Sequence, residues 1–243
     1  MHDLPAGRLA TWATAWLGGR CSFDEALDAL TGEAAHLVTG MPGTDGAVPL
    51  GRSLAALRGL GERRFALVLP VAGDVRGLPR SPGLTPLALE TGQAAVGAGL
   101  VLVPQPLGEV VTWTAFPLAG VPAPPPVEGT LRAASGALDL AVADAARTLA
   151  GLDLARWHPE VPTLLAGLAR AAQVPGMPSD TDPLALSVLA RAQRLARVLD
   201  LAMADTPGGA VTTAQAAARD EALRPLSDAV RDALTAAYNW VPR

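Results

Sequence analysis

The stretch that indicates the fold is Phe65-Ala-Leu-Val-Leu-Pro-Val71, which is followed by Ala72-Gly-Asp-Val-Arg-Gly-Leu-Pro79. It is the densest short apolar run in the chain, and such a run beside Gly and Pro is typical of a buried strand. Pro70 lacks an N–H, so it marks a bulge, an edge position or the end of that strand. The sequence therefore predicts a buried strand that carries Asp74 and Arg76 to the edge of a sheet.

Two further runs predict other strands of this sheet. Leu100 to Val103 is entirely apolar. The interval from Pro104 to Gly108 is short enough for a hairpin loop, so we expect the next run to be its antiparallel neighbour. A short strand is also expected at residues 36–38. The run from Glu109 to Phe116 alternates between two faces, one with Val111, Trp113 and Ala115 and the other with Val110, Thr112 and Thr114.

Apolar residues at helical spacing predict three helices before this region and a fourth within it. The second begins with the capping box Ser22-Phe-Asp-Glu25, and the fourth is a short helix from Thr85. In the first helix we expect both Trp side chains to pack in the core, because large aromatic side chains dominate core energetics. The first carries the stripe Leu9, Trp12, Ala13, Trp16 and Leu17, and the third carries Leu50, Leu54 and Leu57.

The chain after residue 128 has helical periodicity throughout. Apolar stripes predict helices over residues 131–149, 164–168, 188–203 and 212–238. Pro225 falls within the last of these and must start, kink or split it. We expect these helices to form an antiparallel bundle.

A Pro-rich segment separates the two regions. Five prolines between residues 117 and 126 cannot continue a helix or a sheet, which is typical of a stiff extended connector rather than of a Pro-rich peptide ligand. The predicted fold class is therefore α+β. We expect residues 1–120 to hold the N-terminal helices and a small, mostly antiparallel sheet. Residues 121–127 form the connector, and residues 128–243 form a helical region packed on the first as one globular unit.

Composition excludes several classes of function. The chain has 243 residues, a formal charge of −4 and no Lys, which excludes Schiff-base and Walker-type lysine chemistry. No concentrated basic face is present, so we expect no nucleic-acid partner. Cys21 is the single cysteine, which excludes an intrachain disulfide. The absence of a secretory segment and of an apolar run of about 18–20 residues predicts a cytoplasmic protein with no membrane partner.

Common catalytic and metal-binding patterns are also missing. The three histidines, His2, His36 and His158, have no metal-ligand spacing to one another or to Cys21, so we expect no metal and no cofactor. The cluster Gly92 to Gly99 lacks the order of a phosphate-binding loop. Two polar groups, residues 152–160 around Arg156 and the helical arginines 191, 194 and 197, are better explained as a helix end and a solvated face. No catalytic residue is predicted.

The remaining candidate site is the loop that follows the first strand. Asp74 and Arg76 lie between Gly73 and Gly77, and such a turn can present a carboxylate and a guanidinium to a small polar ligand. Four more side chains could line the same region: Asp28, Arg80, Glu90 and Trp113. The alternative, which we favour, is a structural ion pair that holds a long loop in place.

Five segments carry a resemblance to known sequences: residues 7–17, 67–79, 154–160, 223–226 and 237–239. They resemble an uncharacterised protein family of high-G+C actinobacteria. The resemblance covers most of the chain and implies a bacterial cytoplasmic setting, without an activity. We favour a non-catalytic interaction or assembly protein, with a protein partner or a second copy of itself. The alternative is a small-molecule-binding protein or enzyme that uses the Asp74/Arg76 loop.

Overall fold

The computed structural model describes residues 4–118, 131–151, 176–203 and 213–242. These residues divide into two compact units. Residues 4–118, 176–181 and 238–242 form what we call the α/β unit, and residues 131–151, 182–203 and 213–237 form the helical unit. Two short segments from the second half of the chain therefore belong to the same unit as its first half. Whether the two units pack as one globular body stays a prediction.

The α/β unit is built on a six-stranded sheet with the strand order β2-β1-β6-β5-β4-β3. Four neighbouring pairs are antiparallel, and β1 and β6 are parallel. The prediction of a mostly antiparallel sheet is therefore confirmed. The first predicted strand lies at one edge, as β3. The strands are β1 (Ala35–Thr39), β2 (Val48–Pro49), β3 (Ala66–Val68), β4 (Ala94–Val96), β5 (Leu100–Leu107) and β6 (Val110–Pro117).

Strands β5 and β6 form the predicted antiparallel hairpin, but the predicted position of its loop, from Pro104 to Gly108, was wrong. Strand β5 continues through two prolines to Leu107, and the turn consists of Gly108 and Glu109, with Gly108 at φ +60°. The carbonyl of Leu100 faces β4, because it accepts a hydrogen bond from Gly97. Pro104 and Pro106 share this direction by alternation, but β4 pairs with β5 only as far as Leu102. Their missing N–H groups therefore face a side with no paired strand.

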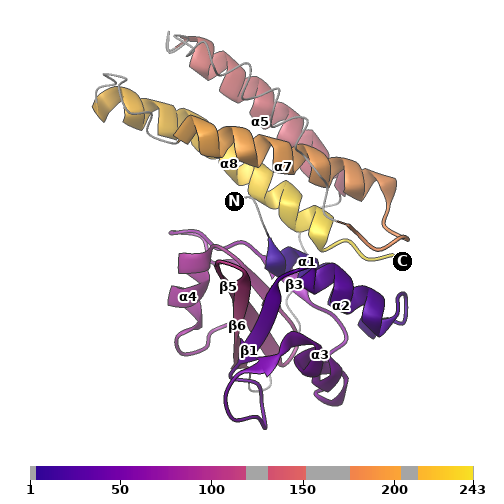
Figure 1. Cartoon of the computed structure of the whole chain (residues 1–243). Coiled ribbons are helices and arrows are strands. Elements are labelled where there is room, and N and C mark those ends of the chain that lie inside the picture. The colour runs from indigo at the N-terminus through magenta and orange to yellow at the C-terminus, as the bar shows by residue number, and fades with distance from the viewer. Residues whose placement is uncertain (1–3, 119–130, 152–175, 204–212, 243) are drawn as a thin grey trace. The chain divides into compact units, whose positions relative to one another are not determined.

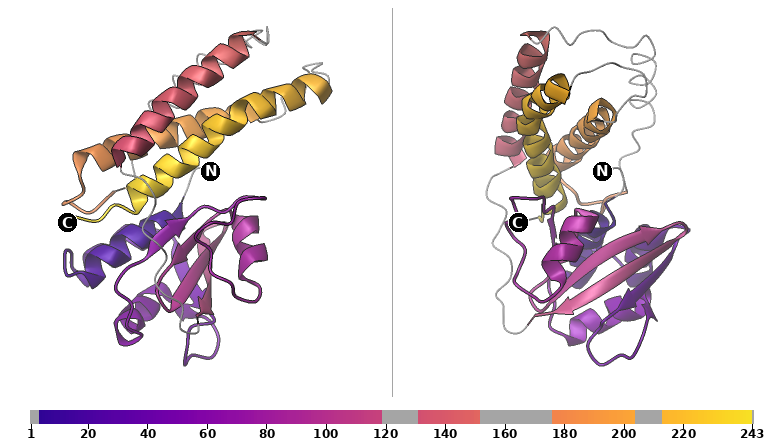
Figure 2. Two further views of the ribbon diagram at one scale, coloured as in Figure 1. Left: turned by 180° about the vertical axis from the view of Figure 1, so that it is seen from behind. Right: turned by 90° about the vertical axis from the view of Figure 1, so that its left-hand side faces the viewer.

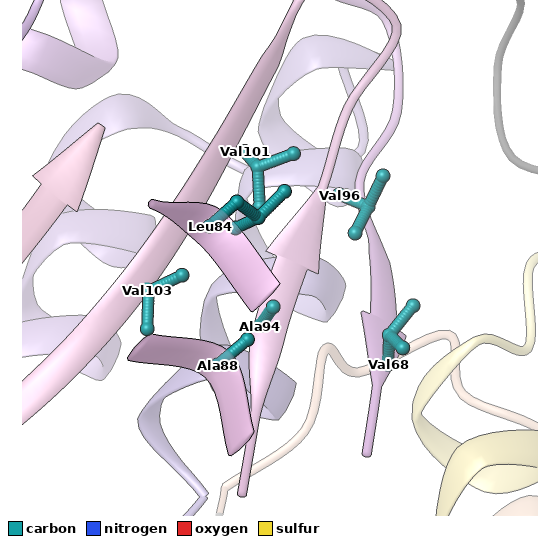
Figure 3. Packing of buried hydrophobic residues seen from close by; sticks show 7 residues of the cluster. All are labelled: Val68, Leu84, Ala88, Ala94, Val96, Val101 and Val103. Atoms are coloured by element: carbon teal, nitrogen blue, oxygen red, sulfur yellow. The ribbon is translucent and has the colours of Figure 1, made fainter. Parts of the chain in front are cut away.

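Four helices cover the two faces of the sheet. Helix α4 (Leu84–Thr91) lies on one face, and α1 (Pro5–Leu17), α2 (Phe23–Thr31) and α3 (Leu50–Gly59) lie on the other side (Figure 1). Under α4, Leu84 and Ala88 pack against side chains of the three strands β3, β4 and β5 (Figure 3). The strand side chains in this cluster are Val68, Ala94, Val96, Val101 and Val103. All four predicted helices are present, and α2 and α4 begin within one residue of the starts predicted from the Ser22 capping box and from Thr85.

Helix α1 is buried on nearly all sides rather than along a single stripe. The predicted core packing is confirmed, since Trp12 and Trp16 are 5% and 6% exposed. Thr11 and Thr14 on the other sides of the helix are buried as well. Groups from distant segments form hydrogen bonds with the polar groups of α1. Gln93 Oε1 accepts from the N–H of Ala6 at 3.1 Å, and Arg58 donates to the carbonyl of Trp16 at 2.9 Å. The Trp12 indole donates to the carbonyl of Gly176 at 2.9 Å. We infer that α1 is the central helix of the α/β unit, against which distant segments of the unit pack.

The helical unit contains α5 (Leu131–Gly151), α7 (Pro183–Met203) and α8, which spans Thr213–Tyr238 (Figure 2). Helices α5 and α7 pack together, and Asp139 of α5 pairs with Arg191 of α7. Pro225 lies inside α8 without ending it. The helix predicted at residues 164–168 lies outside the described residues, and the antiparallel bundle stays a prediction.

Candidate functional site

The loop after β3 begins with a tight turn. The N–H and carbonyl groups of Val71 and Asp74 exchange two hydrogen bonds of 2.9 Å, and Gly73 within the turn has φ +87°. Gly77 has φ +81°, and a Cβ there would lie 3.1 Å from Val68. Since positive φ favours glycine, both glycines are required by the course of the backbone. The loop is an ordered structure that returns to the sheet.

Asp74 and Arg76 bind each other. Arg76 Nε donates to Asp74 Oδ1 and Nη2 donates to Oδ2, both at 2.9 Å, and the backbone N–H of Arg76 adds a bond of 3.2 Å to Oδ1. A bidentate pair of this kind fixes the guanidinium in one orientation. The Arg76 side chain is 78% exposed and that of Asp74 22%, so the pair contributes little to stability. The pair places the guanidinium of Arg76 on the surface, with the carboxylate of Asp74 neutralising most of its charge.

The other proposed lining residues do not converge on this pair. Trp113 is fully buried, and its indole donates to His36 Nδ1 at 3.2 Å. It also lies on the sheet face opposite to Val103, because it pairs with Pro104 across the hairpin. Arg80 is an exposed loop residue. Asp28 on α2 and Glu90 on α4 are exposed on helices that cover opposite sides of the sheet.

The glycine cluster binds a carboxylate from its own chain. Glu62 is 1% exposed, and its two oxygens accept hydrogen bonds from the N–H groups of Ala98 at 2.8 Å and Gly99 at 2.7 Å. A Cβ on Gly97 would lie 2.5 Å from Glu62 Oε2, so only glycine leaves room for this contact. Sequence analysis missed Glu62, because the 36-residue separation hides its relation to the cluster. The site is structural, since the carboxylate is already bound.

Histidine and cysteine do not form a further site in the described residues. Across that part of the chain, no three His, Cys, Asp or Glu side chains come together in a way that could hold a metal ion. Cys21 is half-buried, and burial, followed by the nearby charge of Glu25, raises the pKa of its thiol. A raised thiol pKa lowers the thiolate fraction and hence the reactivity. The predicted helix end around Arg156 lies outside the described residues.

Part of the sheet surface is open to solvent. On the face that carries α4, the strands β1 and β6 present Leu37, Thr39, Thr112 and Thr114, and β5 adds Gln105. Leu37 is 36% exposed and the four polar side chains are half-buried. We call these five residues the open sheet face, and none of them is charged. The alternation of β6 separated its two sets of side chains, but it did not predict that a helix would cover only part of this face.

These features define a two-unit α+β protein with an open, uncharged sheet surface. The chain belongs to the family of Rv1486c-like proteins: the model of the N-terminal domain matches residues 6–129, and that of the C-terminal domain matches residues 132–235.

Two relatives are similar over nearly their whole length. The "Uncharacterized protein Rv1486c" of Mycobacterium tuberculosis is 30% identical over 284 aligned residues, which cover 98% of this chain and 96% of the relative. The "Uncharacterized protein ML1804" of Mycobacterium leprae is 27% identical, with 98% and 97% covered. These matches confirm the resemblance to an uncharacterised actinobacterial family. No solved structure matches the chain. Within the described residues, no helix combines the length and apolar character that a membrane span needs.

Proposed function

We propose that this protein is a non-catalytic assembly protein, and that it associates with a second copy of itself through the open sheet face. The observation that carries the proposal is that this surface lacks charge. The chain is 17% charged, yet none of the five side chains of the face is charged. A face without charge meets its own copy without like-charge repulsion, which suits a two-fold contact between identical surfaces.

The edges of the sheet support contact through the face rather than through strand addition. Strand β2 is two residues long and contains Pro49, both of which discourage pairing with another chain. At the other edge, the outward groups of Leu67 in β3 are already bound by a side chain. Two sheets that pack face to face lie about 10 Å apart and interlock their side chains. The exposed Leu37 and the β-branched threonines suit such packing.

The test is the mass of the intact chain in solution, measured by light scattering across a concentration series. The chain has a mass of 24.7 kDa, and we expect a dimer of twice that mass. Leu37→Arg together with Thr112→Arg places two charges on the face and should give the monomer. The control is Leu60→Arg, since Leu60 is 43% exposed at the end of α3, on the other side of the sheet. A wild-type chain that remains monomeric at its highest soluble concentration, or a face variant that still dimerises, would refute the proposal.

A second candidate is a small-molecule-binding protein or enzyme that uses the Asp74/Arg76 loop. It is supported by the exposed guanidinium of Arg76, which Asp74 holds in one orientation. A screen of metabolites by thermal shift should find a ligand whose stabilisation disappears in Asp74→Ala and in Arg76→Ala. Equal binding to both variants would exclude the loop. Arg80, an exposed residue further along the loop, provides the control variant Arg80→Ala.

The proposal includes a cytoplasmic location. It is supported by the single, half-buried Cys21, because a chain with one thiol gains no intrachain disulfide from an oxidising compartment. A fractionation experiment that recovers the protein outside the cytoplasm would overturn this part of the proposal.

A further inference from the structure

The free edge of β3 is sealed by side chains instead of by another strand. In an antiparallel pair, successive residues direct their N–H and carbonyl groups alternately towards and away from the partner. Phe65 and Leu67 direct theirs away from β4. Thr14 of α1 binds both groups of Phe65, accepting from its N–H at 2.9 Å and donating to its carbonyl at 3.2 Å.

Asn239 does the same for Leu67. Its Oδ1 accepts from the N–H of Leu67 at 2.6 Å, and its Nδ2 donates to the carbonyl of Leu67 at 2.9 Å. One side-chain amide thus makes the two hydrogen bonds that a residue of a neighbouring strand would make. The sequence separation is 172 residues, so the contact joins the first half of the chain to its C-terminal segment.

Further contacts hold this segment in place. The carbonyl of Asn239 accepts from Arg64 at 3.0 Å, and the carbonyl of Tyr238 accepts from the hydroxyl of Thr11 at 3.0 Å. The Tyr238 ring lies against Gly7, where a Cβ would be 3.0 Å from ring atoms. Both residues are buried. They are also the only Tyr and the only Asn in the chain, which suggests that each is present for a specific contact.

We propose that Tyr238 and Asn239 act as an edge clasp: Asn239, held in place beside Tyr238, occupies a strand-binding edge on β3 that, once uncovered, pairs with the same edge of a second copy of this chain. An uncovered edge presents unpaired N–H and carbonyl groups, which template pairing with another strand. Phe65 would stay covered by Thr14, so the uncovered edge centres on Leu67. Because the paired stretch is short, the dimer is weak and forms only at high protein concentration. The clasp explains how the α/β unit keeps an apolar edge strand from associating.

The proposal is tested in the full chain carrying Leu37→Arg and Thr112→Arg, which removes contact through the open sheet face. Any remaining dimer then reports on the edge of β3 alone, so a failure of the edge clasp can be told apart from a failure of the proposed function. Asn239→Ala leaves both groups of Leu67 without the amide. We expect hydrogen exchange at the Leu67 amide to accelerate about tenfold or more, as the loss of a buried hydrogen bond implies. We also expect light scattering to detect dimers that increase with concentration.

Thr14→Val is the matched control, because it removes the side-chain hydrogen bonds to Phe65 at nearly constant volume and leaves the clasp intact. Its Leu67 amide should exchange at the wild-type rate. If Asn239→Ala does not fold, Asn239→Ser keeps a polar side chain too short to make both bonds, and the same exchange measurement applies. Unchanged exchange at Leu67, or a chain that stays monomeric at every concentration while Leu67 exchanges quickly, would overturn the proposal.

Discussion

The bound carboxylate of Glu62 permits a quantitative prediction. Replacing Glu62 by Gln keeps the shape of the side chain but exchanges one acceptor oxygen for an NH2 group. In the wild-type chain, the two oxygens accept from Ala98 and Gly99 at 2.8 and 2.7 Å. In Glu62→Gln only one of these N–H groups keeps an acceptor, and the other faces the NH2 group. The substitution therefore tests one buried hydrogen bond and the desolvation of its donor.

The magnitude follows from these contacts. A hydrogen bond to a charged group contributes about 1.5–3 kcal/mol, and a buried donor left without an acceptor costs about 1–3 kcal/mol. The lost hydrogen bond and the unpaired donor are partly the same effect, so the two values do not add in full. We expect the free energy of unfolding to fall by about 2–4 kcal/mol. The site admits no replacement water easily, because Glu62 is 1% exposed and fills the space beside Gly97.

Urea denaturation of the full chain, followed by Trp fluorescence, measures this change, and hydrogen exchange locates it. The amides of Ala98 and Gly99 should lose protection while those of β6 keep theirs. Glu90→Gln is the control, since Glu90 is exposed on α4 and its substitution should change stability by less than about 0.5 kcal/mol. If Glu62→Gln stays within about 0.5 kcal/mol of the wild type, the two hydrogen bonds do not hold the β4–β5 turn and our reasoning is wrong.

Three further predictions concern the first quarter of the chain. Gly7→Ala should lower the free energy of unfolding by about 1–3 kcal/mol, because its Cβ would lie 3.0 Å from the Tyr238 ring, and a thermal melt that matches the wild type would contradict this packing. Ser22→Ala should cost about 1 kcal/mol by removing the 3.1 Å bond from the Glu25 N–H that caps α2, and Ser22→Asp should retain most of that stability. Burial raises the pKa of the Cys21 thiol above its ordinary value, so alkylation in the folded chain should require a higher pH than in urea; an equal or lower pH midpoint would show that burial does not control this thiol.

Features that depend on neighbouring residues were predicted from the sequence, and features that depend on distant residues were not. Helix α2 was predicted from its capping box and β6 from its alternation, because both signals lie within one element. Strands β2 and β4 were missed. Two or three residues are too short for a period to show, and neither strand lies in a dense apolar run like the one that predicted β3. The turn between β5 and β6 was misplaced because the effect of Pro104 depends on where β4 ends, which no local pattern contains.

The candidate site illustrates the same limit. Asp74 and Arg76 are two residues apart, so the sequence could raise their pairing as an alternative, and the structure contains that pair. Trp113 was named as a residue that could line the same region, whereas its position across from Pro104 directs it to the sheet face opposite to Val103. Glu62 and Asn239 each bind backbone groups of distant segments. Nothing in their neighbouring residues signals such contacts.

The sequence by itself determined the α+β class and, within the described residues, the order of the longer helices and strands. These properties follow from local periodicity and backbone chemistry. Only the tertiary structure decided that Thr14 and Asn239 seal the edge of β3, that Glu62 fills the glycine cluster, and that two late segments join the α/β unit. The physical reason is that buried N–H and carbonyl groups must find partners, and the folded chain supplies them from wherever it brings a suitable side chain.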